Sequence, residues 1–377
     1  MYKKSFILIG MLALLVILAG CTARQEESQN GDQTGQVSSE MEMKETDKAL
    51  VITTLFPQYD FVRQIAGDKV DVKLLVPPGV EAHAYEPTPQ DIVSVQKADL
   101  FIYTGEAMEP WAHKVIDTVG EAGIVVVEAG QGLFDITNEV HDHDDHEEDH
   151  EADDHDHEAD DHDHEADDHD HDHEADDHDH DHEADDHDHE ADEHDHGGVD
   201  PHVWLDPIKA QYMVEHVLEG LIEIAPEHEE SFRMNAKIYM ETLNTLHHDF
   251  EMTFEKTKSH TIMSGGHFAF GHFINRYGLE YESPYEGFAP DAEPTPKKIA
   301  KLIEAVRASE TRAIFYEELV DPKVARIVAE ETEAEMLMLH AAHNVSKEEL
   351  ESGVTYIEIM RSNLENLKIG LNYQGDE

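Results

Sequence analysis

The sequence is poor in cysteine and in basic residues, and both shortages restrict what the protein can do. It has one cysteine, Cys21, and 26 Lys and Arg residues against 86 Asp and Glu, which gives a formal net charge of −60. Nucleic acid is therefore not an expected partner, because binding phosphates requires a basic surface. The excess of acidic groups instead favours cations as ligands.

Long apolar runs are also missing, except at the N-terminus. There, two lysines precede an apolar run over residues 6–19, which predicts a secretory signal and is too short for a comfortable membrane span. The run ends in Leu18-Ala19-Gly20-Cys21, which resembles the lipobox of bacterial lipoproteins, where the signal is cut before the cysteine and the cysteine is acylated. The alternative is an ordinary signal with a chance cysteine. Lipidation at Cys21 would tether the protein outside the cytoplasm and leave no thiol for a disulfide, a metal site or a nucleophile.

A tract over residues 141–196 lacks every large apolar residue, glycine and proline. Its 56 residues are of four types, namely 18 His, 32 Asp or Glu and six Ala, and without these acids the formal net charge is still −28. Such a composition cannot form a core, so a disordered insertion is expected. A solvated acidic linker is one interpretation, but histidine-rich tracts indicate metal binding, since imidazole and carboxylate are ligands for zinc, copper and nickel. Auxiliary metal contacts are expected from histidines along the tract, including His141, His143, His155, His157, His194 and His196.

Outside the tract, short apolar runs alternate with helical patterns. This alternation predicts an α/β fold with mostly parallel sheets. Residues 226–258 predict one long helix with an apolar stripe, about 45 Å in length, which could join two lobes as a rigid strut. The expected strands are 50–56, 72–76, 100–104, 124–128, 260–263, 313–316 and 336–339. The expected helices are 58–66, 89–97, 111–120, 208–225, 226–258, 268–277, 296–307, 322–331 and 355–367.

These elements predict two α/β lobes joined by the long linking helix, with a ligand site in the cleft between them. Asp206-Pro207 is typical of a capped helix start, which gives Asp206 a structural role that competes with any role as a ligand. The predicted segments are a signal peptide (1–21), a flexible tether (22–48), an N-terminal lobe (49–225) that carries the tract, the linking helix (226–258) and a C-terminal lobe (259–377).

Four of the 12 histidines outside the tract stand in loops, three of them after predicted strands. They are His83, His202, His267 and His343. Each alone is more typical of a hydrogen-bonded loop residue than of a ligand. At matching strand ends of two lobes, however, they predict one metal site.

The stretches around His83, His202 and His267, together with Ala292-Glu293-Pro294-Thr295-Pro296, resemble the zinc and manganese substrate-binding lipoproteins of bacterial ABC importers. The resemblance runs in order from about residue 50 to 370. It implies a metal in the interlobe cleft, held by histidines at those three positions, with a fourth position that is typically acidic or left to water. It also implies an ABC permease and its ATPase as partners, a monomeric carrier, and a histidine-rich insertion in zinc-type members.

The fourth position departs from the family pattern. The corresponding stretch, Leu339-His340-Ala341-Ala342-His343-Asn344, has no acid at the expected place. Position favours His343, and His340 is the rival. Three or four imidazoles favour Zn²⁺, whereas Mn²⁺ would prefer more carboxylate and water oxygen.

The leading hypothesis is a carrier without catalytic activity, which captures extracellular zinc for uptake. A manganese carrier or adhesin of the same fold is an alternative. A passive metal buffer would leave the two lobes unexplained. A metalloenzyme would need an open coordination position and a general base, for which Glu317 and Glu293 are the only loop candidates, and neither lies in a motif of that kind.

Overall fold

The computed structural model describes residues 48–120, 123–135, 199–285, 294–309, 311 and 313–375. The predicted signal peptide, almost all of the tether and the whole His/Asp/Glu tract lie outside these residues, and so do Cys21 and Glu293. The described residues form one compact unit. Among the described residues, no helix is both long and apolar enough to cross a membrane.

The first half of the unit is a four-stranded parallel sheet with the strand order β2-β1-β3-β4. Successive side chains of a strand face opposite sides of the sheet. In β1, Val51 therefore joins the core under α1 and α4, while Ile52 joins a second core under α2 and α3. The elements are β1 (Ala49–Thr53), α1 (Phe56–Ala66), β2 (Val70–Leu74), α2 (Pro89–Val95), β3 (Leu100–Tyr103), α3 (Ala112–Val119) and β4 (Val125–Glu128).

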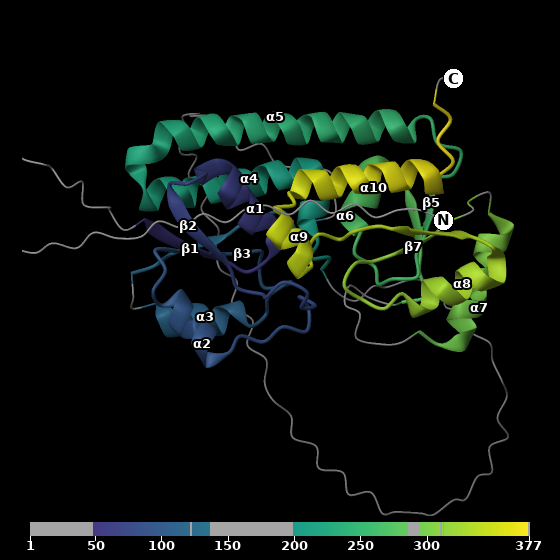
Figure 1. Ribbon diagram of the computed structural model, residues 1–377, viewed down its shortest axis with the longest axis horizontal. Coiled ribbons are helices and arrows are strands. Elements are labelled where there is room, and N and C mark those ends of the chain that lie inside the picture. The colour runs from purple at the N-terminus through teal and green to yellow at the C-terminus, as the bar shows by residue number, and fades with distance from the viewer. Residues whose placement is uncertain are drawn as a thin grey trace, which may run out of the picture. The chain divides into compact units, whose positions relative to one another are not determined.

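Two consecutive helices lead from this sheet to the second half (Figure 1). After the short 3₁₀ turn η1 (Val203–Leu205), α4 (Pro207–Ile224) begins at Asp206, whose side chain accepts a hydrogen bond from the Ile208 amide at 2.9 Å. The predicted capping role of Asp206 is therefore confirmed. A second 3₁₀ turn, η2 (Pro226–His228), precedes α5 (Glu229–Phe254).

Helix α5 is shorter than the 226–258 predicted from the sequence, because the proline turn precedes its first hydrogen-bonded turn. Its 26 residues span about 39 Å. The predicted apolar stripe is buried along its whole length. Its members are Phe232, Ala236, Tyr239, Leu243, Leu246, Phe250 and Phe254.

The second half contains two parallel strand pairs, β5-β6 and β7-β8, which are joined by a bridge between Ser264 and Phe315. Strand β6 and helix α9 are not among the predicted elements, since each is very short. The elements are β5 (Thr261–Met263), α6 (Gly271–Tyr277), β6 (Glu280–Glu282), α7 (Pro296–Ala308), β7 (Ala313–Tyr316), α8 (Lys323–Thr332), β8 (Glu335–Met338), α9 (Lys347–Ser352) and α10 (Tyr356–Gly370).

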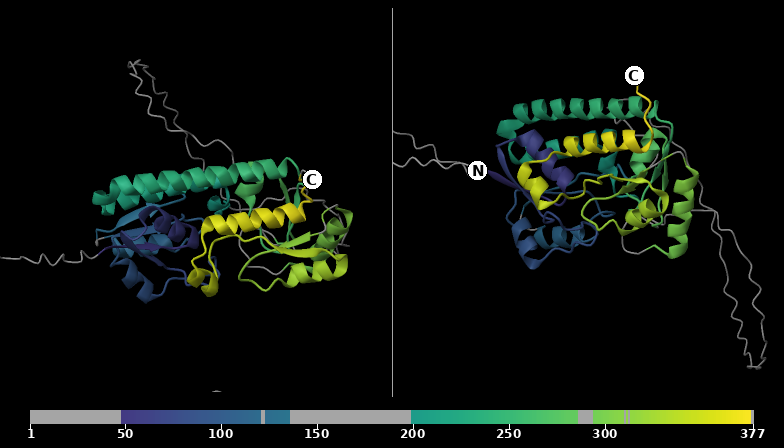
Figure 2. Two further views of the ribbon diagram at one scale, coloured as in Figure 1. Left: turned by 45° about the horizontal axis from the view of Figure 1, so that its top comes forward. Right: turned by 45° about the vertical axis from the view of Figure 1, so that its right-hand side comes forward.

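The two halves share one apolar core, so α5 is not their only connection. Helix α10 runs beside α5 (Figure 2) and brings Tyr356 against Phe61 of α1, with ring centroids 5.4 Å apart. The Tyr356 amide also donates to Asp60 of α1 at 2.9 Å. These contacts hold the two halves together, so the loops that meet between the halves have defined positions.

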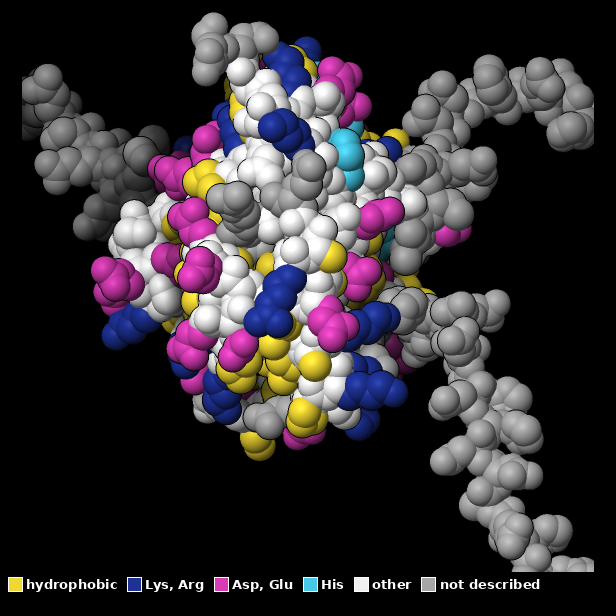
Figure 3. All heavy atoms as spheres, turned by 90° about the vertical axis from the view of Figure 1, so that its right-hand side faces the viewer, with side chains coloured by type: hydrophobic (Ala, Val, Ile, Leu, Met, Phe, Trp, Pro, Cys, Tyr) yellow, Lys and Arg dark blue, Asp and Glu magenta, His cyan; other side chains and the backbone are white. Residues whose placement is uncertain are grey.

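The surface charge is mixed on the side formed by α7 and α8. Figure 3 shows basic and acidic side chains interspersed there, and Arg307 pairs with Glu331 at 3.1 Å and Arg326 with Asp321 at 2.8 Å. Exposed pairs of this kind contribute little to stability. Among the described residues of this face, no continuous basic surface is offered to a polyanion.

Candidate metal centre

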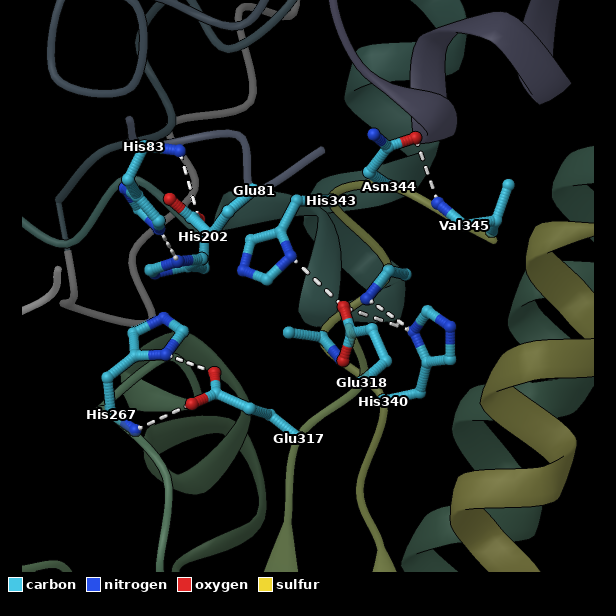
Figure 4. A network of polar contacts seen from close by, with 12 residues as sticks. Glu81, His83, His202, His267, Glu317, Glu318, His340, His343, Asn344 and Val345 are labelled. Atoms are coloured by element: carbon cyan, nitrogen blue, oxygen red, sulfur yellow. Dashed lines mark hydrogen bonds and ion pairs between the residues drawn. The ribbon is translucent and has the colours of Figure 1, made fainter. Parts of the chain in front are cut away.

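Four histidines that are far apart in the sequence meet in one cluster. They are His83, His202, His267 and His343, and one ring nitrogen of each lies within 4.8 Å of those of the others. The Nε2 atoms of His83 and His202 are 3.1 Å apart. Figure 4 shows the four rings facing a common centre. The structure therefore brings together all four residues proposed from the sequence.

The cluster is buried between loops from both halves. His83 comes from the loop after β2, His202 immediately precedes η1, and His267 and His343 follow β5 and β8. The last three are at most 6% exposed, and His83 is partly buried. A cavity of only about 10 Å³ borders His343, with Glu81, Glu317 and Glu318 in its wall. His83, His202 and His267 are not among its lining residues, so this space lies beside the cluster and not at its centre.

Three of the four rings are held by a carboxylate at Nδ1. Asp200 contacts His202 at 2.8 Å, Glu318 contacts His343 at 3.0 Å, and Glu317 lies against Nδ1 of His267. A ring whose Nδ1–H is bound to a carboxylate presents Nε2 as a free lone pair.

The inward-facing nitrogens have the chemistry that a metal requires. The Nε2 atoms of His267 and His343 are buried and have no hydrogen-bond partner among the described residues. Buried polar atoms normally have partners, so such atoms need an explanation. Imidazole nitrogens that converge on one point, each oriented through its other nitrogen, fit a divalent transition metal.

The loop of His83 is tied to the segment that carries His343, although about 260 residues separate them. The Asn344 amide group donates to the Pro77 and Val80 carbonyls at 2.7 and 2.9 Å, and the Gly79 amide donates to the Val345 carbonyl at 2.8 Å. Gly79 has a φ of 82°, which a residue with a side chain adopts only with strain. The position of His83 therefore depends on both halves.

The rival residue His340 lies outside the cluster. Its Nδ1 accepts a hydrogen bond from the Ala342 amide at 2.9 Å, which places the proton of the neutral ring on Nε2. That Nε2 is also buried without a hydrogen-bond partner among the described residues, but in this tautomer it has no lone pair to offer a metal. Asn363 of α10 holds its backbone at both the amide and the carbonyl, each at 2.8 Å. Ala342 has a φ of 60°, and this turn separates His340 from His343.

The electrostatics of the cluster favour a bound cation. Burial, followed by the neighbouring imidazoles, lowers the pKa of His83 to about 2 and that of His202 well below its usual value. Burial opposes the charged form of Glu318 too, but His340 and His343 outweigh it and lower the pKa of Glu318 to about 2. Neutral His83 and His202 can ligate without losing protons. Burial disfavours the charged form of His343 too, but Glu318 outweighs it and raises the pKa of His343, so a protonated His343 would release its proton on ligation.

The carboxylates are the part of the site that the sequence did not reveal. The sequence indicates no role for Asp200 or Glu318, and it offers Glu317 only as a general base. In the structure Glu317 instead holds His267. The one local signal was Asp200, two residues before His202, whose amide it also binds at 3.0 Å. The auxiliary histidines His141, His143, His155, His157, His194 and His196 lie outside the described residues.

Residues 51–370 match the family described as "Zinc-uptake complex component A periplasmic". The chain belongs to this family. The family resemblance predicted from the histidine motifs is thereby confirmed, and so is the mixed α/β fold with parallel sheets.

Similar proteins include the high-affinity zinc uptake system protein ZnuA of Bacillus subtilis, which is 33% identical over 98% of this chain and 99% of its own length. The zinc-binding lipoprotein AdcA of Streptococcus pneumoniae is 29% identical over 88% of this chain but only 58% of its own length. The chain thus spans little more than half of AdcA.

Two solved structures share the fold over most of the chain. The Zn(II)-bound ZnuA-like domain of S. pneumoniae AdcA has a TM-score of 0.62 and 27% identity, and covers 86% of this chain and 99% of its own. The metal-dependent lipoprotein YcdH of B. subtilis has a TM-score of 0.63 and 31% identity, with the same coverages. A laminin-binding protein of Streptococcus agalactiae, at 24% identity and a TM-score of 0.64, shows likeness of fold alone.

Proposed function

We propose that this protein captures zinc ions outside the cytoplasm and delivers them to the permease of an ABC importer for high-affinity uptake. The observation that carries the proposal is the buried cluster of four imidazoles, three of which are oriented by carboxylates at Nδ1. The names of the relatives support the same metal. Zinc is here the cargo, so a site that binds and releases it needs no chemistry beyond ligation.

The ligand atoms favour Zn²⁺ over Mn²⁺. Four imidazole nitrogens suit the four-coordinate, nitrogen-rich sites that zinc prefers, whereas manganese favours oxygen ligands. Asp200, Glu317 and Glu318 each contact the Nδ1 of a histidine rather than supplying an inward-facing oxygen. The same arrangement argues against an enzyme, because Glu317 supports His267 and does not stand free as a base.

The fourth ligand is proposed to be His343. Replacing His343 with alanine is expected to weaken zinc binding by about 100-fold or more, since even the loss of an outer partner of a metal ligand typically costs 10–100-fold. Replacing His340 with alanine is expected to cost less, about 10-fold, through Glu318 alone, which lies 3.3 Å from its Nδ1. Competition with a chromophoric chelator measures both. A larger loss for His340→Ala would assign the fourth ligand to His340 instead.

We propose further that Cys21 is lipidated and that residues 22–48 tether a monomeric carrier to the membrane. The name of AdcA as a lipoprotein supports this location. The proposed lobes are residues 49–225 and 259–377, joined by the helix predicted at 226–258. A change in their relative position on metal binding would let the permease and its ATPase distinguish loaded from empty carrier.

The tract at 141–196 is proposed to collect zinc through many weak contacts, because its carboxylates raise the local cation concentration. Titration of the full chain with zinc and manganese in competition should show one tight zinc site and a set of weaker, pH-dependent ones. Deleting residues 141–196 should remove most of the weak sites and leave the tight one. Loss of the tight site in the deletion, or tighter binding of manganese, would overturn the proposed function.

A further inference from the structure

A second group of metal-ligating side chains lies on the outer surface of α5, separate from the four-histidine cluster. It consists of His247, His248 and Glu251. One Glu251 oxygen lies 3.4 Å from Nε2 of His247, and the other lies 2.9 Å from Nδ1 of His248. We propose that these three side chains form a second, weaker and exchangeable site for a divalent transition-metal cation such as Zn²⁺.

The spacing in the sequence accounts for this convergence. Residues three and four apart on a helix are neighbours on its surface, so Glu251 is adjacent to both His248 and His247. The two imidazole rings have centroids 5.3 Å apart. Because α5 is already folded and packed along its apolar stripe, a cation would have to order only side chains.

His247 resembles the buried histidines in having a hydrogen-bonding group at Nδ1. Its Nδ1 lies 3.1 Å from the hydroxyl of Tyr277, the last residue of α6, and its side chain is 13% exposed. In the tautomer that donates Nδ1–H to that hydroxyl, Nε2 carries the lone pair and lies on the side of Glu251. Burial lowers the pKa of His247, so its neutral, ligating form dominates at neutral pH.

The other two side chains are open to solvent, which predicts weaker binding than at the buried cluster. His248 is 58% exposed and Glu251 is 47% exposed. Three protein ligands leave a fourth position for water, as in open zinc sites. The positive charge of Arg276 opposes a cation at His247, and Asp206 pairs with Arg276 at 2.7 Å and offsets that charge.

The ordinary alternative is a helix surface in which Glu251 merely pairs with two histidines. That alternative predicts no dependence on metal. The metal site and the simple ion-pair surface can be distinguished on the full chain by modifying histidines with diethylpyrocarbonate and locating the modified residues by mass spectrometry. The free zinc concentration is buffered, so that zinc binding at the other sites does not deplete it. Modification of His247 and His248 is expected to slow by at least about tenfold at saturation, because a coordinated nitrogen has no lone pair left to react.

A matched pair of variants shows whether Glu251 takes part. Glu251→Gln should abolish the zinc-dependent protection of both histidines. Asp249→Asn on the same helix, where Asp249 pairs with Arg361 at 3.4 Å, should leave it unchanged. His113 lies 3.4 Å from Glu106 but belongs to no group of three or more possible metal ligands among the described residues, so it should show no protection.

The proposal is overturned if zinc protects neither histidine, protects only one, or protects both equally in Glu251→Gln. None of these results bears on the buried cluster, whose affinity is measured separately by chelator competition. The test of the site on α5 is therefore independent of the test of the proposed function.

Discussion

Replacing His202 with alanine is expected to weaken zinc binding by at least about 100-fold, because it removes a first ligand and not merely an outer partner. His202 is fully buried, its Nε2 lies 3.1 Å from that of His83, and Asp200 holds its Nδ1 at 2.8 Å. Alanine would also leave the Asp200 carboxylate buried beside an empty space, where it cannot substitute as a ligand without moving. Chelator competition on the full chain measures the loss.

The matched control is His216→Ala. His216 lies on α4, fourteen residues further along the chain, and its Nδ1 bonds the Ala129 carbonyl at 2.9 Å, away from the cluster. Its replacement should leave zinc affinity unchanged within about a factor of two, since it neither ligates nor holds a ligand. If His202→Ala retained the affinity of the parent protein, the four-histidine site would be wrong.

The sequence predicts the fold well where a pattern repeats over several residues. The stripe on α5 is one example, since all seven of its predicted apolar positions are buried. The two central strands of the first sheet, β1 and β3, are another, because continuous apolar runs suit strands covered on both faces. By contrast, β6 has three residues with glutamate at both ends, and α9 has six residues marked only by the capping box of Ser346 and Glu349. Elements this short depend on tertiary contacts that no local pattern records.

The candidate site follows the same division between local and distant signals. The four histidines could be proposed because each stands in a loop next to a recognisable motif. Their carboxylate partners could not, except for Asp200, because Glu317 is 50 residues from His267 and Glu318 is 25 residues from His343. For His267 and His343, the carboxylate that contacts Nδ1 is set by the packing of β7 against β5 and β8, not by sequence spacing. The departure at the fourth position shows the same effect, since only the backbone turn at Ala342 separates the roles of His340 and His343.

Replacing Trp204 with alanine is expected to destabilise the protein by about 3–5 kcal/mol, the usual cost of deleting a large aromatic side chain from a core. Trp204 is fully buried, and its indole N–H donates to the Ala341 carbonyl at 2.8 Å, which joins the segment after His202 to the segment before His343. Its ring centroid also lies 5.4 Å from that of His202 and 6.1 Å from that of His343. Urea unfolding of the metal-free protein measures the change in the free energy of unfolding.

The other tryptophan provides the control for that experiment. Trp111 is only partly buried at the start of α3, where it packs on Tyr85 with centroids 5.7 Å apart, so Trp111→Ala should cost about 1–2 kcal/mol. Trp204→Ala should in addition weaken zinc binding, because the cavity loosens two ligand loops at once, whereas Trp111→Ala should not. Unchanged zinc affinity in Trp204→Ala would show that the ligand loops are held by the Asn344 and Gly79 contacts without help from the tryptophan. Equal losses of stability in the two variants would contradict the expected difference in burial. The pair of variants thus tests whether one buried side chain couples the stability of the shared core to the geometry of the site.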